Sequence, residues 1–176
     1  MGKIPTFPLP GTYPRILYGA VIGFLNDVAD DTLTQLGLEV IRMGRTAVIY
    51  ASGFTKNTKK LAEYMARKTD ADIFNLKEQT DIDLKDFDTV VIGTGIHAGN
   101  PYKPAVDFIE KNRDVLSSKK LKIFVSCMYN GEKGDRQKDA LGETFGFPVA
   151  AYFNKKAENM NEEGFPAAVD EFIADL

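Results

Sequence analysis

Short apolar runs that alternate with amphipathic helical stretches constrain the fold of this chain more than any other feature. From Arg45 onward five runs rich in β-branched or aromatic residues recur: TAVIYA (46–51), ADIFNL (71–76), TVVIG (89–93), KIFVSC (122–127) and FPVAAYF (147–153). Such runs predict strands. Three of them are nearly all apolar, as in parallel strands covered on both faces, whereas residues 71–76 include polar residues and are predicted to lie at an edge. The expected fold is therefore α/β with a mostly parallel five-stranded sheet.

Amphipathic stretches between the runs predict helices that connect the strands. Residues 132–144 are the weakest of these, because Gly134 and Gly142 lower helix propensity. The last helix is expected to have Pro166 in its first turn. Right-handed crossovers at each connection give a doubly wound sheet, which binds ligands at the carboxyl ends of its strands. The residues predicted to share helical faces are Leu61, Tyr64, Met65 and Lys68; Pro104, Ala105, Phe108, Ile109 and Leu116; and Val169, Phe172, Ile173 and Leu176.

Residues 1–44 differ in character and are predicted to be an N-terminal extension of a domain that spans 45–176. Prolines make the start extended or irregular. The apolar run ILYGAVIGFL (16–25) is well below the roughly 20 residues that span a bilayer, so an integral membrane protein is not expected. Asp30 and Asp31 are predicted to cap a helix whose face holds Leu33, Leu36, Val40 and Ile41.

Charge and cysteine usage exclude several function classes. The net charge is −3 with scattered Lys and Arg, which argues against nucleic-acid binding. The single cysteine, Cys127, excludes an internal disulfide and any multi-cysteine metal site, and it favours a reducing compartment. We therefore expect a cytoplasmic protein of one domain, without a metal.

The first loop that is expected to carry chemistry, SGFTKNT (52–58), follows the first run and leads into a helix. Its hydroxyls, the Asn57 side chain and the free amides of a helix N-terminus suit a phosphate monoester. The same residues also suit an ordinary helix cap, and both interpretations stay open. Neither the Walker spacing nor a GxGxxG motif is present, which disfavours ATP and NAD. The candidate residues are Ser52, Gly53, Phe54, Thr55, Lys56, Asn57 and Thr58.

Two further loops follow the third and fourth runs. In TGIHAGNPY (94–102), glycines permit a close approach to a flat ligand, and His97 or Tyr102 could lie against a ring. The alternative is a glycine-rich turn with a surface histidine, and we assign no general base. In SCMYNGEKG (126–134), Tyr129 could stack on an aromatic ligand, while the alternative is a turn beside a buried Cys127 that is no nucleophile. Together the three strand ends favour a phosphorylated flat ring, FMN.

At this point the sequence resembles the flavodoxin-like superfamily, in particular the branch that includes menaquinone-dependent protoporphyrinogen dehydrogenase and short flavodoxin-domain proteins. The resemblance covers residues 45–176 and is carried by AVIYAS with TKKLAEYMA, by LKDFDTVVIGTGIHAGNPYKPAVDFIEKN and by KIFVSCMYNGE. It implies the strand order 2-1-3-4-5 and an FMN phosphate at 52–58. The isoalloxazine contacts that it implies are Thr94, Gly95, Ile96, His97, Ala98 and Gly99, and Cys127, Met128, Tyr129, Asn130 and Gly131.

The sequence departs from the family pattern at two places. The family's phosphate loop has a glycine before the Asn-Thr pair, where this chain has Lys56. Either a non-glycine residue takes a positive φ there, or Gly53 replaces the glycine. The region between Phe153 and Asn161 is also shorter than in the porphyrinogen-oxidising branch.

The resemblance implies an FMN-dependent flavoprotein that transfers electrons to a redox partner protein or to a small-molecule acceptor. Such transfer needs no catalytic acid or base, because the cofactor performs the redox chemistry. Gly95 and Gly99 are expected near the flavin N5, with Tyr129 stacked on the ring. Two alternatives stay open: a flavodoxin-like interaction module that has lost FMN, and an oxidoreductase that acts on a quinone or a porphyrinogen.

Overall fold

A computed structural model describes residues 44–127 and 129–176 of the chain. Arg45–Leu176 forms a compact unit. The predictions for residues 1–43, which are the irregular start, the apolar run 16–25 and the helix after Asp31, lie outside the described residues.

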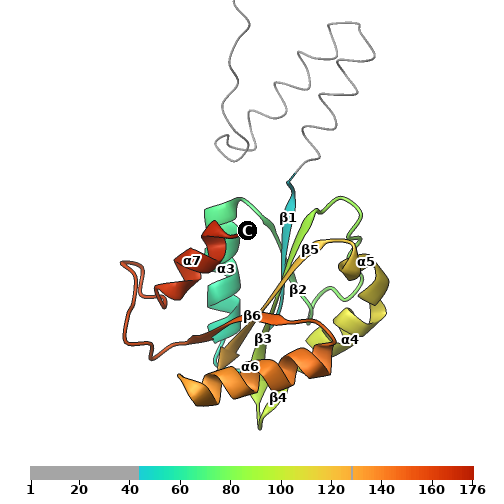
Figure 1. Cartoon of the computed structure of the whole chain (residues 1–176). Coiled ribbons are helices and arrows are strands. Elements are labelled where there is room, and N and C mark those ends of the chain that lie inside the picture. Colours follow the sequence, from blue (N-terminus) through green and yellow to red (C-terminus); the bar gives the residue numbers. More distant parts are fainter. Residues whose placement is uncertain (1–43, 128) are drawn as a thin grey trace, which may run out of the picture. The chain divides into compact units, whose positions relative to one another are not determined.

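A parallel sheet of five strands organises this unit, in the order β2-β1-β3-β5-β6 (Figure 1). The two-residue strand β4 pairs only with β3, antiparallel to it. Without β4, the order is the predicted 2-1-3-4-5, and β2 lies at an edge as its polar residues indicate. The strands are β1 (Thr46–Ala51), β2 (Asp72–Asn75), β3 (Thr89–His97), β4 (Asn100–Pro101), β5 (Lys120–Cys127) and β6 (Val149–Asn154).

Helices cover both faces of the sheet. Helices α3 (Asn57–Thr69) and α7 (Ala168–Ala174) lie on one face, and α4 (Lys103–Lys111), α5 (Arg113–Ser117) and α6 (Glu132–Phe145) lie on the other (Figure 1). The helical face predicted for 104–116 is divided between α4 and α5, because Asn112 leaves the helical backbone with φ −109° and ψ 16°. Helix α7 begins at Ala168, so Pro166 precedes the helix instead of lying in its first turn.

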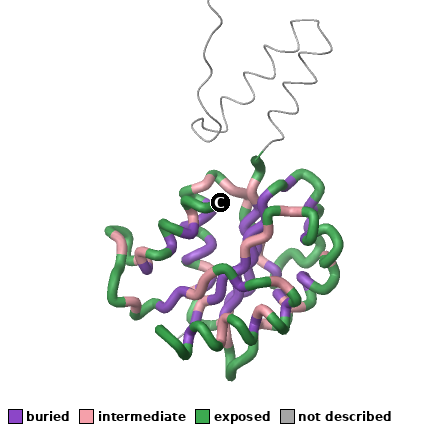
Figure 2. The backbone as a smooth tube through the Cα atoms, viewed as in Figure 1, coloured by how far each residue is buried: buried purple, intermediate pink, exposed green. Residues whose placement is uncertain are grey.

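Two apolar cores result from the alternation of side chains along the strands. In β1, Ala47, Ile49 and Ala51 face the core under α4, α5 and α6, whereas Val48 and Tyr50 face the core under α3 and α7. Residues 47–51 are all buried, and in Figure 2 the strands are the most continuous buried stretches of the chain. Burial on both faces explains why this run is almost entirely apolar.

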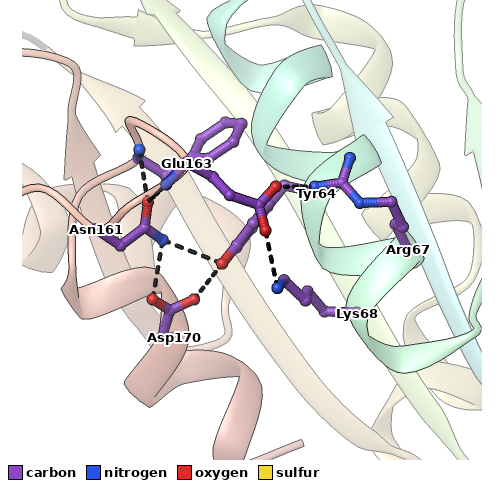
Figure 3. A network of polar contacts seen from close by, with 7 residues as sticks. Tyr64, Arg67, Lys68, Asn161, Glu163 and Asp170 are labelled. Carbon is purple, nitrogen blue, oxygen red and sulfur yellow. Dashed lines mark hydrogen bonds and ion pairs between the residues drawn. The ribbon is translucent and has the colours of Figure 1, made fainter.

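A polar network fixes the segment between β6 and α7 onto α3 (Figure 3). The Tyr64 hydroxyl of α3 donates to Asp170 Oδ1 of α7 at 2.5 Å. The Asn161 side-chain amide donates to the same hydroxyl (3.0 Å) and to Asp170 Oδ2 (2.8 Å). Glu163 pairs with Lys68 at 2.8 Å and also with Arg67.

The network shifts the titration of its acidic and phenolic groups. The hydrogen bond from Tyr64, followed by that from Asn161, lowers the pKa of Asp170. The hydrogen bond from Lys68 lowers the pKa of Glu163. The bond to Asp170 raises the pKa of Tyr64. Each shift favours the charge state in which these groups form the network at neutral pH.

Candidate functional site

The first candidate loop connects the carboxyl end of β1 to the start of α3. Its backbone enters the helix through Lys56, which has φ 56° and ψ 16° in the left-handed region. Gly53 is not among the described residues with positive φ. Of the two expectations for this loop, the structure supports the first: a non-glycine residue takes the strained position, at a cost of roughly 1–2 kcal/mol.

The start of α3 has the features of an anion site. No side chain caps this helix. The first hydrogen bond of the helix is the one that Lys60 N–H donates to Lys56 O (3.0 Å). The N–H groups of Asn57 and Thr58 donate to no atom of the described chain. Ser52 is only 7% exposed, and its hydroxyl oxygen has no hydrogen-bond partner in the part of the chain that the structure describes. The Ser52 hydroxyl and the first amides of α3 are thus polar groups of one loop without partners in the described chain, and groups of this kind can bind an anion.

The other residues of the first loop lie at its surface or behind it. Thr58 is 2% exposed and forms the back of the loop. Phe54, Thr55 and Lys56 are exposed, and the Phe54 side chain is fully so.

The second candidate loop is a tight hairpin at the end of β3. His97 pairs with Asn100 and Ile96 with Pro101, which makes β4 the return strand of the hairpin (Figure 1). Ala98 (φ 49°) and Gly99 (φ 84°) form the turn, the combination of positive φ values that two-residue hairpins use. The loop is thus a glycine-containing turn with an exposed histidine at the expected strand end, a geometry compatible with both interpretations of the sequence.

Hydrogen bonds of Thr94 hold the base of this hairpin. The Thr94 hydroxyl donates to Gly95 O at 3.0 Å, and Tyr102 N–H donates to Thr94 Oγ1 at 3.1 Å and to Gly95 O at 3.3 Å. Thr94 is fully buried. The backbone around Gly95 is therefore fixed, whereas the turn at Ala98 and Gly99 is exposed.

The third candidate loop follows β5. Cys127 is buried, its thiol lies 3.3 Å from Tyr129 O, and burial raises its pKa, so it is a protonated thiol and no nucleophile. Tyr129 is 50% exposed, and Asn130 is exposed. Gly131 precedes α6 with φ 58° and ψ −148°, a conformation essentially restricted to glycine. Met128 lies outside the described residues.

The sheet register brings these loops together. Ala51 of β1 pairs with Thr94 of β3, and Gly95 pairs with Ser126 of β5. The three loops therefore begin at neighbouring positions on one edge of the sheet. The chain passes from β1 outward to β2 and then returns to β3 on the other side of β1, which makes the β1/β3 boundary the topological switch point where such sheets bind ligands.

Tyr102 lies at this site but is not among the cofactor-binding residues predicted from the sequence. Its ring lies across Gly53 and Gly95, at the ends of β1 and β3. The sequence indicated only that Tyr102 ends the loop 94–102 and could lie against a ring. Two grooves have volumes of about 340 Å³ along β6 and about 390 Å³ beside the Tyr64–Asp170 network; Asn130 of the third loop lines the first, and no residue of the first or second loop lines either.

Neither a metal site nor a membrane-spanning helix is present in the part of the chain that the structure describes. Within residues 44–127 and 129–176, no group of three or more His, Cys, Asp or Glu could hold a metal ion. In the same residues, no helix has both the length and the apolar character needed to cross a membrane.

The model of the family described as "Flavodoxin domain" matches residues 47–168, well over half of the chain. The chain belongs to this flavodoxin family. The matched region of the flavodoxin domain contains all three loops, from Ser52 to Gly131. Membership of the family therefore agrees with the α/β fold and the strand order described above.

Individual relatives of this flavodoxin domain are distant. An uncharacterized protein of Methanocaldococcus jannaschii is 28% identical over 109 residues, which are 58% of this chain and 71% of that protein. Oxidised flavodoxin 2 from Bacillus cereus has a TM-score of 0.54 at 15% identity, covering 73% of this chain and 95% of that one. Rubredoxin oxygen:oxidoreductase from Desulfovibrio gigas has a TM-score of 0.51 at 13% identity, covering 81% of this chain and 37% of that one. At these identities the solved structures show the fold alone.

Proposed function

We propose that this flavodoxin domain binds FMN at the carboxyl ends of β1, β3 and β5 and acts as a redox protein. The observation that carries the proposal is the buried Ser52 hydroxyl, without a partner in the described chain, beside the open amides of Asn57 and Thr58. A phosphoryl group at this place would accept hydrogen bonds from all three. A bound anion would also interact favourably with the N-terminal end of the α3 dipole.

The flavin ring would lie between the second and third loops. In this placement the turn at Ala98 and Gly99 would present backbone to one side of the ring, and Tyr129, which is half exposed, would present an aromatic face to the other. FMN supplies the electron-transfer chemistry when it is bound. The residues of the chain bind and orient it, and no protein acid or base is assigned. Electrons would pass to a partner protein or a small-molecule acceptor.

The finer assignment to the quinone- or porphyrinogen-type branch is a separate hypothesis. Turnover of a quinone or of protoporphyrinogen by flavin-loaded protein tests it. An interaction module that has lost FMN would show neither turnover nor flavin binding.

The visible spectrum of the freshly purified full chain, followed by titration with FMN, tests the proposal. We expect flavin absorption bands in the purified protein or saturable quenching of flavin fluorescence with one FMN per chain. Absence of both bands and quenching would overturn the proposal.

Ser52→Ala separates a ligand-binding role from a structural one. Removing a buried hydroxyl that lacks a partner should leave the free protein equally or more stable. The same change removes a bond to a charged group, so FMN should bind about tenfold more weakly. Ser117→Ala, at an exposed position of α5 where the hydroxyl donates only to Arg113 O (2.9 Å), is the control and should leave FMN affinity unchanged. A loss of stability without loss of FMN affinity would show that Ser52 is structural.

A further inference from the structure

Tyr102 spans the switch point between β1 and β3. A Cβ built on Gly53 would lie 1.7 Å from the Tyr102 hydroxyl oxygen and 2.4 Å from Cζ. A Cβ built on Gly95 would lie 2.4 Å from Cε2 of the same ring. The edge of the ring therefore packs on β3, and its hydroxyl end reaches across to the loop after β1. Neither glycine can carry a side chain while the ring stays there.

The backbone of Tyr102 is held firmly in this position. Its N–H donates to Thr94 Oγ1 and Gly95 O, and its carbonyl accepts from Ala105 N–H at 3.0 Å at the start of α4. Tyr102 thus links the end of β3 to the first turn of α4. These bonds fix the backbone of Tyr102, and with it the point from which the ring extends over Gly95 and Gly53.

The Tyr102 hydroxyl has no hydrogen-bond partner among the described residues. It lies against Gly53, the residue next to Ser52, whose buried hydroxyl also lacks a partner there. Behind the ring, Thr58 Oγ1 would lie 3.2 Å from a Cβ on Gly95. The Tyr102 hydroxyl thus lies against Gly53, and the Thr58 hydroxyl, in the first turn of α3, lies close to Gly95. A phenylalanine would pack on both glycines equally well, so packing alone does not account for the hydroxyl.

We propose that Tyr102 is a phosphoryl-binding residue contributed by the second loop: its hydroxyl donates to the same anion as Ser52 and the α3 amides. This inference rests on the proposed function for the identity of the ligand as FMN, but its geometry requires only a phosphoryl group. It couples the two loops, because the residue that fixes the hairpin base also contacts the phosphate loop.

Tyr102→Phe tests the proposal, since it removes the hydroxyl and keeps the ring on Gly53 and Gly95. Binding of FMN, riboflavin and inorganic phosphate to the full chain is measured by fluorescence or calorimetry. Riboflavin carries the same ring system without the phosphoryl group. We expect the variant to bind FMN about tenfold more weakly, to bind inorganic phosphate more weakly, and to bind riboflavin as the unmodified chain does. Tyr152→Phe, whose ring packs near Gly134, is the matched control and should change none of the three.

The outcomes separate this inference from the proposed function. Unchanged or tighter FMN binding by Tyr102→Phe would overturn it. Equal losses of FMN and riboflavin would also overturn it, because they would assign the effect to the ring. If the unmodified chain binds phosphate but no FMN, and the variant loses phosphate binding, the inference stands and the FMN proposal fails. If the unmodified chain binds neither FMN nor phosphate, both fail.

Discussion

The Tyr64 hydroxyl lies 2.5 Å from Asp170 Oδ1 and joins α3 to α7 across 106 positions of sequence. Tyr64 is almost fully buried, and its ring stacks on Phe165 with centroids 4.4 Å apart. The hydroxyl, and not the ring, makes the polar connection. The contact therefore ties the C-terminal helix to the first helix of the domain.

Tyr64→Phe should weaken this connection while keeping the stacked ring. We expect the free energy of unfolding in urea to fall by about 1 kcal/mol, the usual net value of a hydrogen bond. Tyr129→Phe, at a half-exposed position, is the control and should have no effect. Equal effects of the two substitutions would show that the Tyr64–Asp170 bond contributes nothing.

Stability should depend on pH through Asp170. Its folded-state pKa is lowered from an ordinary value of about 3.9, so the folded state favours the carboxylate. The stabilisation is fully present above that ordinary value and is lost as the pH falls through the folded-state pKa. Between neutral pH and pH values below about 4, Asp170→Asn should therefore lose less unfolding free energy than the unmodified chain.

Denaturation curves at several pH values check this dependence. Asp139→Asn changes an exposed carboxylate with no hydrogen bond or ion pair in the described chain, and it should leave the acid limb of the stability curve unchanged. A curve of Asp170→Asn parallel to that of the unmodified chain would contradict the role of the network.

The two glycines of α6 should respond in opposite ways to alanine. A Cβ on Gly142 would find its nearest neighbour, Phe147 O, at 3.4 Å, so Gly142→Ala should add about 0.5–1 kcal/mol of stability through helix propensity. A Cβ on Gly134 would lie 2.6 Å from Tyr152 Cζ. Gly134→Ala should therefore lower stability, because the ring must move. Thermal unfolding of both variants measures the difference, and an equal gain in the two would refute the packing argument.

Lys56 occupies the left-handed position before α3, where a β-branched residue is strongly disfavoured. Lys56→Val should cost at least ~1 kcal/mol more than Lys60→Val, which changes an exposed lysine with helical backbone. Lys56→Gly relieves the strain but increases the freedom of the unfolded chain, so its effect should stay within about 0.5 kcal/mol. Urea denaturation measures all three, and equal losses for the two valine variants would contradict the strain.

The fold could be predicted from the sequence wherever burial alone dictates residue type. Residues 47–51 are apolar because both faces of β1 are covered, and β2 carries polar residues because it lies at an edge. The β3–β4 hairpin was not predicted, since its turn has Ala98 where Asn or Asp would be the usual signal. The helix over 132–144 was only weakly predicted because Gly134 lowers helix propensity. The structure explains this glycine, since it makes room for the ring of Tyr152.

For the candidate site, the sequence could locate the strand ends but not the contacts across them. Periodicity places Ser52 directly after the first strand and Gly95 just beyond the run 89–93, whereas β3 continues through Gly95 to His97. The parallel topology makes the two positions neighbours. That Tyr102 covers both Gly53 and Gly95 depends on the path of the chain through the hairpin, which local pattern does not encode. The strained Lys56 could be anticipated, because the family pattern has a glycine at that place.

Flavin binding at the carboxyl ends of β1, β3 and β5 is tested most directly by amide NMR of the isotope-labelled full chain during titration with FMN. The amide resonances of Asn57 and Thr58 should move as their N–H groups acquire an acceptor, together with those of Gly95 and Gly131. Riboflavin should move the latter pair but leave the α3 amides in place. Unmoved resonances at all four positions, or changes confined to the groove beside Asn161 and Asp170, would contradict the proposed site.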